Sequence, residues 1–134
     1  MPPKLEAVRD WFVYGQADLE TARYLLQSDP PFLRQACLHL QQAMEKTLKG
    51  VLLLNDQRPP RTHSLADLIG LCERWIPGLA VRANTTEWLT AYAEDERYPG
   101  QVPSVTAELA NEGLAQVETI MAFIHSAVPP EVRP

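Results

Sequence analysis

Apolar side chains recur at alternating spacings of three and four residues along much of this chain, and this periodicity restricts its fold more than any other feature. Such spacing lines the side chains up along one face of an α-helix. It predicts two long amphipathic helices, over residues 5–28 and about 32–55, each ended by a pair of prolines, Pro30-Pro31 and Pro59-Pro60. The stripe positions are Val8, Phe12, Gly15, Leu19, Ala22 and Leu26, then Leu33, Cys37, Leu40, Met44, Thr47, Leu48 and Val51.

Three further helices are expected in the second half of the chain. Ser64, with Asp67 three residues later, has the pattern of a capping box and opens a helix that runs to Ile76-Pro77-Gly78. Asn84 with Glu87 opens a short helix that stops at Tyr98-Pro99-Gly100, and Ser104 is the expected cap of the last helix. The apolar residues of the first two of these helices are Leu68, Ile69, Cys72 and Trp75, then Trp88, Leu89 and Tyr92, and the stripe of the last helix is Ala110, Gly113, Val117, Ile120, Ile124 and Ala127.

The sequence has no alternating strand pattern and no hairpin signal, so it predicts an all-α protein. The natural way to bury these stripes is an up-and-down antiparallel bundle of four to five helices. We expect one domain over residues 1–128 and a frayed, proline-rich tail over 129–134. Gly15 and Gly113 lie on the buried side and are interpreted as packing positions.

Composition excludes several classes of protein and site. A length of 134 residues, 46% of them hydrophobic, suits one soluble domain, and a net charge of −5 argues against holding long nucleic acid by charge alone. No segment has the length of a membrane span or the pattern of a secretion signal, so we expect a cytoplasmic protein. Cys37 and Cys72 are interpreted as buried reduced thiols in preference to a disulfide. The sequence suggests no cofactor and no metal site, because its three histidines fall on separate elements and no glycine-rich nucleotide loop is present.

Polar residues occupy the side of the second helix opposite its apolar stripe. At about 100° per residue this side carries His39, Gln42, Glu45, Lys46 and Lys49. The simplest interpretation is a solvated face, with neighbours such as Gln42 and Lys46, or Glu45 and Lys49, pairing along the helix.

The loop that follows, "NDQRPPRTHSL", holds Arg58, Arg61 and His63. Guanidinium groups bind phosphate, and a histidine can move a proton near neutral pH, so Arg58 with His63 is a candidate for metal-free RNA cleavage. In the alternative interpretation the arginines only solvate the loop, and His63 helps to satisfy the free amides of the third helix.

Four blocks together resemble the HEPN domain family, named for its occurrence in higher eukaryotes and prokaryotes. They are "DWFVYGQADLETARYLL", "ACLHLQQAMEKTLKGVLL", "RTHSLADL" and "AYAEDERYPGQVP", in that order. The resemblance rests on Gln-x-x-Glu-Lys-x-x-Lys in the second block and Thr-His-x-Leu in the third. It implies a helical bundle, commonly a homodimer, often encoded beside a minimal nucleotidyltransferase and sometimes paired with it as toxin and antitoxin.

The resemblance implies two competing functions. Catalytic members are metal-independent endoribonucleases in which an arginine is followed, after four to six residues, by a histidine. Here the matching arginine is Arg97, yet the corresponding positions hold Val102, Pro103 and Ser104. The resemblance thus favours the other branch, a non-catalytic module that binds a nucleotide, RNA or the nucleotidyltransferase partner.

For that branch the expected nucleotide-binding residues are Glu45, Lys46, His63, Arg97 and Tyr98. Lys46 and Arg97 would contact phosphate, Tyr98 would stack on a base and His63 would donate a hydrogen bond. The alternatives are a ribonuclease toxin that uses Arg58 and His63, and a structural scaffold without a ligand.

Overall fold

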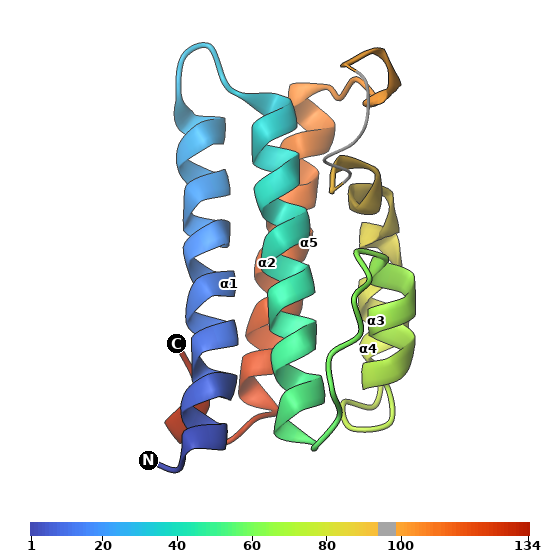
Figure 1. Ribbon diagram of the computed structural model, residues 1–134. Helices are drawn as coiled ribbons and strands as arrows, with labels where there is room; N and C mark the ends of the chain where they lie inside the picture. The colour runs from blue at the N-terminus through green and yellow to red at the C-terminus, as the bar shows by residue number, and fades with distance from the viewer. Residues whose placement is uncertain (94–98) are drawn as a thin grey trace.

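Three long helices form the frame of the molecule: α1 (Pro3–Gln27), α2 (Leu33–Leu54) and α5 (Ala107–Ser126). The structure, a computed structural model, describes residues 1–93 and 99–134. Figure 1 shows α1 running up, α2 running down beside it and α5 running down behind α2. Helix α2 is central, because it packs against α1, α3 and α5.

The fourth position of the bundle is filled by short elements. After α2 the chain returns upward as a loop, and α3 (Leu65–Cys72) then runs down. Helix α4 (Leu79–Ala83) continues directly into the 3-10 helix η1 (Asn84–Tyr92), which runs up (Figure 1). Two short 3-10 turns complete the order, η2 (Pro99–Gln101) and η3 (Pro130–Val132). The prediction of an all-α up-and-down bundle is confirmed, and no strand occurs in the described ranges.

The start of α3 confirms the predicted cap. Ser64 is the N-cap, and its hydroxyl oxygen accepts a hydrogen bond from the amide of Asp67 at 3.2 Å. The third helix ends earlier than expected, at Cys72, and a turn through Gly78, with φ of 90°, separates it from α4.

The caps predicted at Asn84 and Ser104 are wrong. Asn84 has helical backbone angles because α4 leads straight into η1, and Glu87 accepts a 2.6 Å hydrogen bond from the amide of Ala66 in α3. The cap of α5 is Thr106, whose hydroxyl oxygen accepts from the amide of Leu109 at 3.1 Å. The element that begins at Asn84 ends at Tyr92, earlier than expected, and the expected stop at Tyr98 lies outside the described residues.

The tail, for which the sequence predicts fraying, is packed. Pro130–Val132 forms a 3-10 turn against α1, and Val132 is fully buried. Arg133 fastens the end of the chain, since its Nε and Nη2 donate to the carbonyl oxygen of Val128 at 3.1 and 2.8 Å. An apolar side chain among the prolines is thus enough to anchor the tail in the core.

The core lies between α2 and the elements around it, and glycines allow close contact there. A Cβ atom at Gly15 would lie 2.8 Å from Thr47 Oγ1 and 3.1 Å from the carbonyl oxygen of Ala43, both on α2. At Gly113 it would lie 2.9 Å from the Trp88 ring. The packing role predicted for both glycines is confirmed. None of the helices in the described ranges is long and apolar enough to span a membrane.

Candidate functional site

Two clusters of charged and polar side chains flank α2, one toward the loop before α3 and one toward α1. The first, which we call the His63 cluster, consists of Gln41, Glu45 and Lys49 of α2 and His63 of the loop before α3. The second, the Asp18 cluster, consists of Asp18 of α1 with His39 and Lys46 of α2.

Glu45 is the centre of the His63 cluster. Its Oε1 lies 2.8 Å from His63 Nδ1 and accepts a hydrogen bond from Gln41 Nε2 at 3.0 Å, and its Oε2 accepts from Lys49 Nζ at 3.0 Å. Gln41 Nε2 also donates to the carbonyl oxygen of His63 at 3.0 Å, which fixes the loop to the helix. Glu45, Lys49 and Gln41 are 6%, 8% and 0% exposed, whereas the side chain of His63 is 52% exposed.

The charge state of Glu45 follows from this environment. Burial is the strongest single influence and raises the pKa of Glu45, but hydrogen bonds from Gln41, His63 and Lys49, with the Lys49 charge, together outweigh it and lower the pKa. Glu45 is therefore ionised at neutral pH and can only accept hydrogen bonds. His63 must then carry a proton on Nδ1, which directs its other ring nitrogen, Nε2, away from Glu45.

The Asp18 cluster joins α1 to α2. Asp18 Oδ2 accepts a hydrogen bond from Lys46 Nζ at 2.6 Å, and its Oδ1 lies 2.9 Å from His39 Nδ1. Asp18 is 9% exposed, so both of its oxygens are used inside the helix pair. Lys46 keeps partial access to solvent, with 29% of its side chain exposed.

The interpretation of the α2 polar side as a solvated face is wrong for its central residues. The loop before α3 and α3 itself fold back over Glu45 and Lys49, a tertiary contact that helix periodicity does not reveal. The expected pair of Glu45 with Lys49 forms, but it is buried. The expected pair of Gln42 with Lys46 does not form, because Gln42 donates to Gln41 and Lys46 to Asp18.

The residues expected to bind a nucleotide are only partly brought together. Glu45 and His63 are in direct contact, whereas Lys46 is turned toward α1 and pairs with Asp18. Arg97 and Tyr98 lie outside the described residues, so their relation to His63 stays a prediction.

The interpretation in which His63 satisfies the free amides of the third helix is also wrong. The His63 ring contacts Glu45 and does not satisfy the amides of α3, since those of Leu65 and Ala66 donate to Thr90 and Glu87 instead. In the described part of the chain no hydrogen bond or ion pair joins Arg58 to His63. Arg58 lines a separate pocket of about 210 Å³ beside Arg74 and Trp75.

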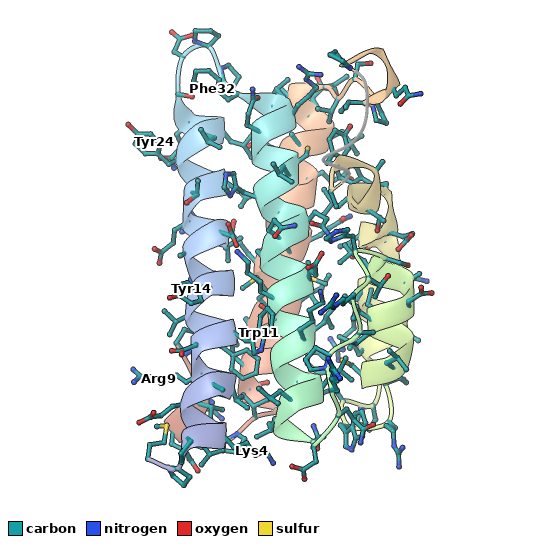
Figure 2. The ribbon with its side chains drawn as sticks, viewed as in Figure 1. Lys4, Arg9, Trp11, Tyr14, Tyr24 and Phe32 are labelled. Atoms are coloured by element: carbon teal, nitrogen blue, oxygen red, sulfur yellow. The ribbon has the colours of Figure 1, made fainter. Side chains whose placement is uncertain are left out.

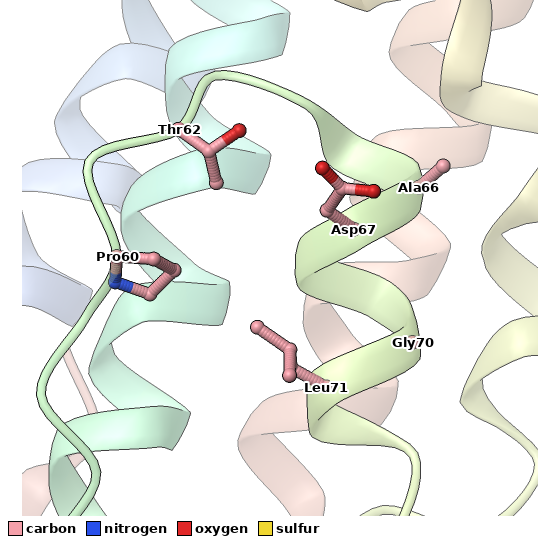
Figure 3. A pocket seen from close by; sticks show the side chains of 6 residues that line it. All are labelled: Pro60, Thr62, Ala66, Asp67, Gly70 and Leu71. Atoms are coloured by element: carbon pink, nitrogen blue, oxygen red, sulfur yellow. The ribbon is translucent and has the colours of Figure 1, made fainter.

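The loop and α3 also enclose an open groove. Figure 3 shows Pro60 and Thr62 of the loop facing Asp67 and Leu71 of α3. The hollow that these residues line has a volume of about 530 Å³. The groove shares Pro60 and Leu71 with the pocket that Arg58 lines. The two hollows are therefore neighbours.

Four residues that the structure brings into these sites are not predicted as site residues from the sequence, although Trp75 is expected on the third helix. Gln41 and Asp18 belong to the two polar clusters, and Arg74 and Trp75 belong to the pocket. Asp18 had a usable signal, because it directly precedes Leu19 on the stripe of the first helix and so lies at the edge of the buried face. No group of three or more histidine, cysteine or acidic side chains suited to a metal ion gathers among the residues that are described.

Comparison with known proteins agrees with this architecture. A sequence model of the HEPN domain family matches residues 8–127. The crystal structure of TT1696 from Thermus thermophilus superposes with a TM-score of 0.75 at 27% sequence identity, covering 90% of this chain and 98% of that chain. A search of curated proteins finds no match. By the extent of the family match, which spans all the main helices, the chain belongs to the HEPN domain family.

Proposed function

We propose that this chain is a non-catalytic HEPN module of the cytoplasm that binds a nucleotide or a protein partner and works with a separately encoded minimal nucleotidyltransferase. The observation that carries the proposal is the incomplete catalytic pair of the family. Arg97 has Val102, Pro103 and Ser104 where the histidine would stand. Without that histidine no side chain of the motif is left to move the proton of an RNA 2′-hydroxyl.

The proposed nucleotide contacts centre on His63. Its ring is half-exposed and held in place by the buried Glu45, so a ligand can reach it without disturbing the core. Lys46 and Arg97 are proposed to contact phosphate and Tyr98 to stack on the base. Because Lys46 is paired with Asp18, its ammonium would have to turn toward the ligand or act on it through the field of its charge.

Calorimetry with a panel of nucleoside mono-, di- and triphosphates tests the nucleotide part. We expect binding of at least one nucleotide by the full chain, weakened by His63→Ala and by Arg97→Ala. Co-purification with the nucleotidyltransferase encoded next to this chain tests the partner part. The proposed site would be contradicted if no nucleotide gave a heat of binding and if Lys46→Ala and Arg97→Ala still bound the partner. The remaining interpretation would then be a structural scaffold without a ligand.

We also propose that the chain is a homodimer. The outer side of α1 and the turn after it expose large apolar side chains that a second copy could cover, namely Val13, Tyr14, Tyr24 and Phe32, which are 39%, 63%, 74% and 51% exposed. Figure 2 shows Tyr24 projecting away from the bundle. Light scattering should give twice the 15.1 kDa mass of one chain, and Tyr24→Glu should reduce it toward a monomer. A monomeric native chain at micromolar concentration would contradict the dimer.

One observation favours the alternative, a metal-independent endoribonuclease toxin. The buried carboxylate of Glu45 orients the half-exposed His63 at 2.8 Å, an arrangement that suits a general base. Cleavage of RNA in EDTA that is abolished by His63→Ala and by Arg58→Ala would establish this activity. Intact RNA after incubation with the pure chain would support the binding module.

A further inference from the structure

A basic pocket lies where the end of α2 meets the end of α3, apart from the His63 cluster. Arg58 and Gln57 reach it from the loop, and Arg74 and Trp75 reach it from the turn after α3. Its volume is about 210 Å³, and it adjoins the groove of Figure 3, with which it shares the lining residues Pro60 and Leu71. Pocket and groove together are large enough for a small organic molecule.

Both arginines of this pocket lack a carboxylate partner within the described residues. The two acidic side chains nearest to them in sequence have other partners: Asp56 pairs with Lys4 at 2.6 Å. Glu73 accepts hydrogen bonds from the amides of Gly78 and Ala80 at 3.0 and 2.9 Å, at the start of α4. Among the described residues, two guanidinium groups without a carboxylate partner therefore line one pocket of a chain whose net charge is −5.

Arg74 also contacts an aromatic ring that lines the same pocket. Its guanidinium carbon lies 4.8 Å from the centre of the Trp75 ring, a cation–π contact. A cation–π contact leaves N–H groups of the guanidinium that can donate hydrogen bonds to a carboxylate or phosphate. Less conformational freedom is then lost when an anion binds.

The rest of the pocket is apolar. Leu52 and Pro60 line it together with Leu71, which is 49% exposed although it is a large hydrophobic residue. Asp67 lies in the adjoining groove and is the acidic group there. A ligand that fits must combine one compact anionic group with an apolar part, and a ligand with many negative charges along the groove would meet Asp67.

We propose that this pocket binds an organic anion with its carboxylate or phosphate between Arg58 and Arg74 and its apolar part against Leu71 and Pro60. The site goes beyond the proposed function, because it uses none of the residues assigned to the nucleotide. It makes the end of α2 and α3 a second ligand-binding region of the chain.

The proposal is tested by NMR titration of the full chain with phenyl phosphate and with benzoate, following the indole N–H of Trp75 and the amide of Leu71. We expect saturable shifts with at least one of the two probes. Inorganic phosphate, which has only the anionic group, and benzyl alcohol, which has only the apolar ring, should bind more weakly. A preference for phenyl phosphate would indicate phosphate esters as the source, and a preference for benzoate would indicate carboxylates.

Variants separate this site from general charge effects. Arg58→Gln and Arg74→Gln should each weaken binding by about tenfold, the loss expected for one charge-assisted hydrogen-bonded contact. Arg61→Gln is the matched control, since Arg61 is exposed in the same loop but does not line the pocket, and it should leave the affinity unchanged. No saturable shift with either probe, equal binding of benzyl alcohol, or an equal loss with Arg61→Gln would overturn the proposal.

Discussion

Glu45 and His63, eighteen residues apart in the sequence, are joined by a 2.8 Å contact between Oε1 and Nδ1 that fixes the loop before α3 to the middle of α2. The ionised carboxylate accepts three hydrogen bonds inside the fold, from His63, Gln41 and Lys49. The half-exposed ring of His63 is thus held in place by a buried, charged carboxylate. Glu45 therefore contributes both to the stability of the fold and to any function of His63.

Glu45→Gln should lower the free energy of unfolding by about 3 kcal/mol at pH 7, because it leaves the buried ammonium of Lys49 without its charge partner. Glu118→Gln is the control, since Glu118 pairs with Arg23 at 3.4 Å with both side chains more than a third exposed, and it should cost about 0.5 kcal/mol or less. Urea unfolding measures the loss of stability in both variants. Equal losses for the two variants would show that the buried cluster contributes no more than a surface pair.

The same carboxylate predicts a pH dependence. The folded pKa of Glu45 lies below its ordinary value of 4.5, so its contribution to stability is present above pH 4.5 and is lost as the pH falls through the folded pKa. The stability difference between the native chain and Glu45→Gln should therefore shrink when urea unfolding is repeated at progressively lower pH below 4.5. A difference that stays constant down to pH 3 would contradict the lowered pKa.

Gly15→Ala should destabilise the bundle by about 1–3 kcal/mol, because the added Cβ would lie 2.8 Å from Thr47 Oγ1 and 3.1 Å from a backbone oxygen of α2. Gly70→Ala is the matched variant, since nothing lies within 4 Å of a Cβ at Gly70 in α3. It should stabilise the chain by about 0.5–1 kcal/mol, because alanine favours a helix more than glycine does. The two variants should shift the free energy of unfolding, measured with urea, in opposite directions. A loss of stability in both variants would disprove the difference in packing.

The two cysteine thiols should be unreactive in the folded protein. Burial raises the pKa of Cys37 to about 11 and that of Cys72 to about 12, so little thiolate forms at pH 8. A coloured disulfide reagent should therefore detect both thiols after unfolding and almost none before it. Ala122→Cys, at an exposed position of α5, should add one thiol that reacts at once in the folded state. Rapid native reaction of Cys37 or Cys72 would show that the core opens readily.

The long helices could be predicted because their apolar periodicity is local and strong. Most stripe positions of α1, α2 and α5 are buried, but Leu26 and Leu33 are half-buried and Ala127, just past the end of α5, is exposed. The Ser64 cap needed only a three-residue pattern. The caps at Asn84 and Ser104 failed because several nearby side chains can cap a helix, and tertiary contacts decide among them. Glu87, for example, caps α3 and not its own helix.

The polar clusters could not be predicted from periodicity. Placing residues around one helix shows which of them face away from the stripe, but not which other elements cover that side. Glu45 is predicted to be solvated, yet the loop before α3 returns over it, and Lys46 is predicted to share its site although Asp18 of α1 holds it. Burying such charges depends on contacts between residues far apart in sequence, which leave only a weak local signal.

His125 should make the stability of the fold depend on pH near neutrality, in a range separate from that of Glu45. Burial, and to a smaller extent the charge of Arg133, lower the pKa of His125 below its ordinary value of 6.5, and its Nε2 is buried without a hydrogen-bond partner in the described part of the chain. The folded state thus keeps His125 neutral. Below pH 6.5 the unfolded chain gains a proton that the folded chain does not, so stability is full above pH 6.5 and is lost as the pH falls from there through the folded pKa.

His125→Phe should remove this dependence, since an apolar ring can keep the edge-to-face contact that His125 makes with Phe12, whose ring centre lies 5.8 Å away. Urea unfolding of both proteins between pH 8 and pH 5 measures the effect: the native chain should lose more stability than the variant over this range. An NMR titration of the His125 ring provides an independent check, with Arg133→Gln raising the pKa only part of the way to 6.5 because burial is the larger cause. A His125 that titrates at its ordinary pKa would contradict both expectations.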